Sequence, residues 1–201
     1  INFLRADGTF APTAGGGSAI VGMIIPWAGA SVPPTYQLAY GQLLSRTTFV
    51  DLYSVITATQ TVTCTGGNPT ITVTADNAAR MTIGGHIESS CFIPGTTVIS
   101  KTANTLTMIN NALGNTSATI TLFPWGNGDG STTFNVPNLM GRSIVGRDNM
   151  SGSTAGVLTS TFYGANPDAL GASGGAQSTT LVAGNLPPYT PSGSVSGSVA
   201  I

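Results

Sequence analysis

The sequence predicts a mainly β fold with one short helix, of the α+β class. Three observations predict it. Threonine alternates with strand-forming residues in several short stretches between residues 57 and 123. Only the segment before residue 57 shows the spacing of an amphipathic helix. Residues 125–142 contain four glycines and one proline and show no helical period, so backbone geometry constrains them more than reaction chemistry does.

The alternating stretches predict half-buried strands, because successive side chains of a strand point to opposite faces. They cover residues 62–65, 70–74, 96–99, 105–108 and 119–122, and turns rich in Gly, Asn and Pro separate them. We therefore expect a small antiparallel β module at 57–123. Outside this module, residues 20–27 are also β-rich, and residues 29–40 predict a loop with a short strand.

The predicted helix begins after Ser45 and ends at Ile56. Ser45 is a suitable N-cap residue, because its hydroxyl can accept a hydrogen bond from the first turn. Apolar residues then follow at positions i, i+3, i+4 and i+7, which places them on one face: Phe49, Leu52, Tyr53 and Ile56. We expect this face to pack on a sheet.

Composition excludes several classes of function. The chain has 201 residues, of which six are Lys or Arg and seven are Asp or Glu, with 41% hydrophobic residues and a net charge of −1. This balance argues against disorder. The basic residues are scattered, so no nucleic-acid partner is expected. The apolar run at 20–27 is interrupted by Gly22 and Pro26 and is shorter than the roughly 20 residues of a membrane helix. No membrane insertion is expected.

The two ends of the sequence differ from its middle. Residues 1–18 end in three glycines and a serine and are interpreted as a linker or the end of a shaft. Residues 191–201 alternate small polar and apolar residues, which predicts a β segment leading to an unseen C-terminal part. We expect the chain to be a segment of a longer polypeptide.

Four segments together resemble the phage tail collar domain of bacteriophage short tail fibres and related tail adhesins. They are residues 22–29, 33–46, 52–56 and 128–142, and the run from Asp129 to Phe134 is the most specific part. The family usually joins the helix to the Gly-Asp-Gly run by a few residues, whereas about 66 intervene here, which costs little loop entropy. The expected organisation is a first collar half at 19–56, an inserted module at 57–123 and a second half at 124–190.

The inserted block also resembles a Thr-rich β module of phage tail proteins, through residues 93–98 and 104–107. Within the collar, the resemblance assigns a fold motif to Asp129, Gly130, Thr133, Phe134, Pro137, Gly141 and Arg142. Asn138 and Met140 replace an Asp and an Arg that the family often has, so an ion pair is missing there.

The resemblance implies a homotrimer on the virion tail, assembled in the host cytoplasm. It also implies contacts with other tail or baseplate proteins and with a bacterial surface glycan or outer-membrane receptor. Short tail fibres often bind a metal through a His-x-His pair, but Tyr189 and Pro191 occupy those positions here. Neither side chain is a suitable transition-metal ligand, so no metal and no cofactor are expected.

No catalytic residues are expected. The Gly-x-Ser-x-Gly pattern at 171–175 lies in a glycine-rich loop without the strand–turn–helix setting of a nucleophile. His86 is the only histidine, and we interpret it as a surface or turn residue, with a receptor contact as the alternative. The carboxylates that a glycosidase would need do not cluster in the sequence: Asp129, Asp148, Asp168 and Glu88.

Cys64 and Cys91 form either a disulfide or a pair of buried thiols. Because a phage protein assembles in a reducing cytoplasm, the sequence favours the thiols. Among aromatic residues, Trp27, Trp125, Tyr36 and Tyr40 are predicted to be buried in the collar core. Phe162 and Tyr163 lie in a polar loop and are predicted to contact either a sugar or a neighbouring subunit.

The function predicted from the sequence is that of a structural and adhesive component of a phage tail fibre, which mediates or supports attachment to the host surface. Two alternatives remain. The chain is a connector between fibre and baseplate without receptor binding, or it is a tail depolymerase whose carboxylates meet between subunits.

Overall fold

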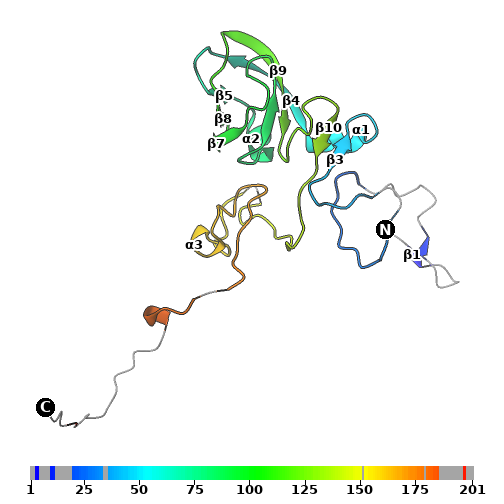
Figure 1. Ribbon diagram of the computed structural model, residues 1–201, viewed down its shortest axis with the longest axis vertical. Helices are drawn as coiled ribbons and strands as arrows, with labels where there is room; N and C mark the ends of the chain where they lie inside the picture. Colours follow the sequence, from blue (N-terminus) through cyan, green and yellow to red (C-terminus); the bar gives the residue numbers. More distant parts are fainter. Residues whose placement is uncertain are drawn as a thin grey trace.

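The computed structural model describes residues 3–4, 10–11, 20–33, 36–150, 152–178, 180–185 and 197 (Figure 1). In the segment predicted as a linker, β1 (Phe3–Leu4) pairs antiparallel with β2 (Phe10–Ala11). The rest of that segment lies outside the described residues. So do Tyr189 and Pro191 and, apart from Gly197, the predicted β segment at 191–201.

Two antiparallel sheets of three strands make up the lobe at the top of Figure 1. The first has the order β4 (Ala58–Cys64), β9 (Thr116–Phe123) and β6 (His86–Glu88). The second has the order β5 (Thr70–Thr72), β8 (Thr105–Met108) and β7 (Val98–Lys101). Each strand-forming stretch of the sequence overlaps one of these strands, and the mainly β class is confirmed. Strand β6 was missed, because its three residues show no alternation with threonine.

The core of this lobe follows the alternation along its strands. Val62 and Cys64 in β4 are buried. The threonines that alternate with them, Thr61 and Thr63, are exposed. The same pattern on the other strands produces one cluster of buried side chains, which stabilises the lobe through removal of apolar surface from water. The cluster contains Val62, Cys64, Ile71, Val73, Ala78, Met81, Ile87, Cys91, Phe92, Val98, Leu106, Met108, Ala112, Ile120 and Leu122.

The predicted helix forms, but it is shorter than expected. Helix α1 spans Val50–Ile56 and has no side-chain N-cap. The prediction of Ser45 as N-cap was wrong, since Ser45 ends strand β3 (Leu43–Ser45) and its hydroxyl accepts a hydrogen bond from the Thr48 N–H at 3.3 Å in the following turn. The predicted apolar face is confirmed: its four residues pack on a second cluster of Leu44, Phe123, Phe134 and Val136.

Three further helical segments were not predicted: α2 (Ala75–Arg80), α3 (Ser160–Tyr163) and the 3₁₀ turn η1 (Ala183–Asn185). They are too short to show a helical period in sequence. One local and one distant hydrogen bond define the two ends of α2. The Thr74 hydroxyl accepts from the Asn77 N–H at its start, and the Lys101 ammonium donates to the Ala78 carbonyl at 3.1 Å near its end. Among the described residues, no helix is long and apolar enough to cross a membrane.

The β-rich segment at 20–27 forms no strand, so that prediction was wrong. An apolar run becomes a strand only where a partner strand satisfies its backbone groups, and none of the described strands pairs with it. The predicted burial of the collar aromatics also fails in part. The side chains of Trp27 and Tyr40 are 57% and 47% exposed, and those of Tyr36 and Trp125 are only half-buried.

Candidate functional site: a junction of three chain segments

A short sheet joins two distant segments of the chain. Strand β3 pairs antiparallel with β10 (Thr133–Asn135), so that Leu44 lies opposite Phe134. The pairing continues beyond the strands, because the Gly41 N–H donates to the Pro137 carbonyl at 3.2 Å and the Leu139 N–H to the Ala39 carbonyl at 2.8 Å. The glycine-rich segment at 125–142 therefore returns to the strand that precedes α1.

Asp129 organises the turn before β10. Its carboxylate accepts backbone N–H bonds from Ser131, Thr132 and Thr133 at 2.8–3.0 Å. The Thr133 hydroxyl in turn accepts from the Asp129 N–H at 2.9 Å. The hydroxyl of Thr132 and these N–H groups stabilise the ionised form, so they hold the pKa of Asp129 well below its usual range. Gly130 completes the turn with φ of +78°. Asp129 therefore stabilises the turn through these hydrogen bonds.

Two glycines of the segment at 125–142 allow the turn to lie close to β10. A Cβ on Gly126 would meet the Asn135 side-chain oxygen at 2.6 Å, and a Cβ on Gly128 would overlap Thr133. Both have positive φ, at +116° and +65°. Because the turn lies close, the side-chain amide of Asn135 accepts a hydrogen bond from the Gly128 N–H and donates one to the Gly41 carbonyl, both at 3.0 Å.

Arg46 connects the short sheet to the β lobe. It donates from Nε to the Thr133 carbonyl at 2.9 Å and through its two terminal nitrogens to the Glu88 carboxylate at 2.9 and 2.6 Å. The guanidinium also lies over the ring of Phe123, 4.7 Å from the centroid. Hydrogen bonding to Glu88 is the main cause that raises the pKa of Arg46. One side chain therefore holds together the segments around β3, β6 and β10.

Residues 22–62 match the family model of the phage tail collar domain. This segment of the chain is similar to the collar domain. The match contains β3 and α1 and continues past Ile56 into β4, and the Asp129 turn lies outside it. No curated protein and no solved structure matches the chain.

Three motif residues remain to be placed: Phe134, Gly141 and Arg142. Phe134 is fully buried, and its ring meets that of Tyr53 edge-on with centroids 5.4 Å apart. Gly141 has φ of +66°. Arg142 donates to the Asn138 carbonyl at 3.1 Å and to the Ser173 hydroxyl at 3.2 Å. Ser173 of the Gly-x-Ser-x-Gly pattern thus contacts an arginine.

The proposed contact residues come from two separate elements. His86 lies in the edge strand β6, opposite Phe123 and bridged to Thr97, and therefore not in a turn. The side chain is half-buried, and its Nδ1 is buried without a hydrogen-bond partner among the described residues. In α3, Phe162 is 89% exposed, whereas the Tyr163 hydroxyl donates to the Ala172 carbonyl at 3.1 Å.

Asp148 and Asp168 accept hydrogen bonds within their own loop, although Oδ1 of Asp168 is buried without a partner among the described residues. Asp148 accepts from the backbone N–H groups of Gly156, Val157 and Leu158 at 2.6–3.0 Å, and the bond from Leu158 is the main cause that lowers its pKa. Asp168 accepts from the Thr154 hydroxyl at 2.7 Å. Both residues fold the loop at 148–172. Among the described residues, no group of three His, Cys, Asp or Glu side chains is placed to hold a metal ion.

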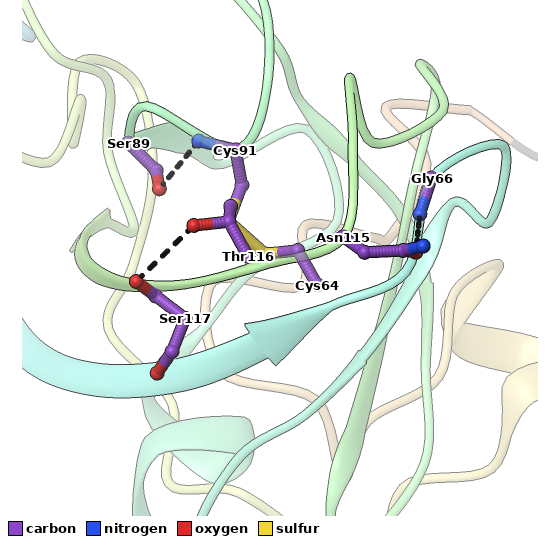
Figure 2. The surroundings of a disulfide bond; sticks show 7 residues. All are labelled: Cys64, Gly66, Ser89, Cys91, Asn115, Thr116 and Ser117. Atoms are coloured by element: carbon purple, nitrogen blue, oxygen red, sulfur yellow. Dashed lines mark hydrogen bonds between the residues drawn. A yellow bond between two sulfur atoms is a disulfide. The ribbon is translucent and has the colours of Figure 1, made fainter.

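Cys64 and Cys91 are joined by a disulfide, so the expectation of two buried thiols was wrong. Figure 2 shows the bond linking Cys64, at the end of β4, to Cys91, which follows β6. Both residues are at most 1% exposed, and the Ser89 hydroxyl accepts from the Cys91 N–H at 3.1 Å. Packing of the β lobe brings the two sulfur atoms together, and a cellular compartment by itself does not determine whether they meet.

Proposed function

We propose that this chain is a structural and adhesive component of a phage tail fibre, which mediates or supports attachment to the bacterial surface. The observation that carries the proposal is the collar match at 22–62. The pairing of β3 with β10 supports it, because the match then belongs to a folded unit with the Asp129 turn.

The proposed organisation is a collar split by a β module at 57–123. Two features support it. The module has its own buried cluster, distinct from the one under α1. Strand β4 pairs along its whole length with β9, so Ala58 lies opposite Leu122 and the two ends of the module lie side by side. An insertion into a loop requires ends that are close together.

The proposed assembly is a homotrimer in the virion tail, formed in the host cytoplasm. It would contact other tail or baseplate proteins and a surface glycan or outer-membrane receptor. A chain with 6% charged residues supports this assembly, because permanent interfaces are more apolar than exposed surfaces. Phe162, exposed on α3, is the residue that we propose for a receptor or subunit contact.

We propose that the chain has no catalytic activity. The hydrogen bonds to Asp129, Asp148 and Asp168 support this, because each carboxylate is engaged in shaping a loop. Glu88 is paired with Arg46. A depolymerase would need a carboxylic acid and a carboxylate facing one sugar across a few ångströms.

Three measurements test the proposal. Gold-labelled antibodies against the chain are expected to decorate the tail of virions that encode it, and label on the capsid would contradict a tail component. The purified chain is expected to compete with virions for adsorption to host cells. Tail labelling without competition would favour the connector. Sustained release of reducing ends from host polysaccharide would favour the depolymerase instead.

A further inference from the structure

One dipeptide at the junction of β3, β6 and β10 is chemically labile in a free chain. Asn127 and Gly128 form the one Asn-Gly pair in the sequence, and they lie in the turn before β10. In a flexible peptide, the backbone nitrogen of such a glycine attacks the side-chain carbonyl carbon of the asparagine, because no Cβ obstructs its approach. This reaction is one reason why asparagine counts among the thermolabile residues. It closes a five-membered succinimide ring and releases ammonia.

Hydrogen bonds hold both reacting groups of this pair. The Gly128 N–H, which has to lose its proton, donates to the side-chain oxygen of Asn135 at 3.0 Å. The side-chain NH2 of Asn127, which has to leave as ammonia, donates to the Glu88 carboxylate at 3.1 Å. Ring closure breaks both bonds, and a hydrogen bond to an ionised acceptor is roughly twice as strong as one between neutral groups.

The peptide group between the two residues is held as well. The Asn127 carbonyl accepts from the Arg46 guanidinium at 3.0 Å and from the Gly130 N–H at 3.1 Å. Both Asn127 and Gly128 are half-buried. The side chains that hold the pair lie in or beside β3, β6 and β10, so they meet only when the junction is closed. When the junction opens locally, the pair regains the freedom that the reaction needs.

We propose that Asn127 is a deamidation site that the closed junction protects, and that its reaction makes an opening of the junction irreversible. The nitrogen of Gly128 forms a bond to Cγ of Asn127, the bond from Cγ to Nδ2 breaks, and the leaving NH2 group takes up the proton of the glycine N–H. Water then opens the ring on either side of the glycine nitrogen and leaves an aspartate or an isoaspartate. Water is the only co-reactant, so the reaction proceeds whether or not the chain belongs to a tail fibre.

The new carboxylate accounts for the irreversibility. It replaces a donor that lies 3.1 Å from Glu88 by an acceptor with the same charge as Glu88, and like charges at such a distance repel. Arg46 has little capacity to compensate, because it already donates four hydrogen bonds out of the five N–H groups of a guanidinium. The charge of Asp129 also acts on Arg46. An isoaspartate adds a methylene to the backbone of the turn besides.

Deamidation rates of the full chain test the protection. Mass spectrometry of proteolytic peptides follows Asn127 at mildly alkaline pH, in folded wild type and in wild type unfolded by urea. We expect the folded chain to react at least ten-fold more slowly. Asn135→Ala and Glu88→Ala each remove one of the two acceptors and should accelerate the reaction of the folded chain. Equal rates in folded and unfolded wild type would overturn the proposal.

A matched control separates local protection from global stability. Thr74→Ala removes the N-cap of α2, which destabilises a helix, and Thr74 takes part in none of the hydrogen bonds that hold the pair. Urea below the unfolding transition brings the variants to the same free energy of unfolding. Asn127 should then react at least five-fold faster in the Asn135→Ala chain than in the Thr74→Ala chain. Equal rates would mean that only global unfolding exposes Asn127, which contradicts protection by the junction.

Substitution by the product residue tests the irreversible step. Asn127→Asp should lower the urea midpoint of unfolding more than Asn127→Ala does, because alanine only removes a donor, whereas aspartate adds a like charge beside Glu88. In a Glu88→Gln background the order should reverse, since a carboxylate at position 127 can then pair with Arg46. If Asn127→Asp is as stable as Asn127→Ala in both backgrounds, the irreversible step is refuted.

Discussion

The guanidinium of Arg46 and the carboxylate of Glu88 form a two-point ion pair, with N–O distances of 2.6 and 2.9 Å. The two residues are 42 positions apart and come from the collar segment and the β lobe. Their side chains are 15% and 27% exposed, so water screens the pair only in part. Asn127, from the segment before β10, donates to the same carboxylate at 3.1 Å. The pair is thus the polar link between the two clusters of the fold.

Removal of one partner should be costly. Glu88→Gln leaves the Arg46 charge partly buried without its carboxylate, and we expect a loss of about 2–4 kcal/mol in the free energy of unfolding. Denaturant titration measures it. Asp76→Asn is the matched control, since the Asp76–Arg80 pair is 77% and 45% exposed and should contribute less than about 0.5 kcal/mol. Equal losses for the two variants would contradict the assigned role of Glu88.

The Asp129 turn should make stability depend on acid pH. The pKa of Asp129 is lower in the folded chain than in the unfolded one, so its contribution is complete above the ordinary Asp pKa of about 4 and is lost as pH falls toward the folded pKa. Asp129→Ala should therefore lower the melting temperature at pH 7. The difference from wild type should shrink steadily below about pH 4. A difference that stays constant down to pH 2 would rule out the carboxylate as its source.

Gly128 should tolerate substitution less well than a glycine in open space. Ala at position 128 meets both a positive φ and an overlap with Thr133, so Gly128→Ala should cost about 2–4 kcal/mol. Gly67 has φ of +77° with nothing within 4 Å, and Gly67→Ala should cost only the backbone term of about 1–2 kcal/mol. Urea unfolding curves of the two variants compare them. A larger loss for Gly67→Ala would refute the close approach of the turn to β10.

The disulfide should stabilise the β module. It links residues 27 positions apart, and closing such a loop restricts the unfolded chain by about 2–4 kcal/mol. We expect a phosphine reductant, added under denaturing conditions before refolding, to lower the melting temperature of the wild type. The double variant Cys64→Ala with Cys91→Ala serves as control and should not respond. An equal response from both proteins would mean that the reductant acts elsewhere.

The strands of the β module could be predicted because their cause is local. In β4 and β8 the alternation of Thr with apolar residues predicts which side chains face the core. The apolar ones are the side chains that form it. The apolar face of α1 could be predicted for the same reason, because it depends on the spacing of residues close together in the sequence. Strand β6 and helix α2 could not be predicted, because elements of three to six residues show too little periodicity. Their ends also depend on bonds to distant side chains.

By itself, the sequence determined the mainly β class, the collar resemblance and the apolar pattern of each long strand, since these depend on residue order over a few positions. Tertiary structure alone decided that Cys64 meets Cys91 and that Arg46 meets Glu88. It also decided that residues 20–27 stay without a partner strand and leave an apolar groove. Contacts between residues far apart in the chain depend on how whole elements pack, and local sequence patterns do not encode that packing.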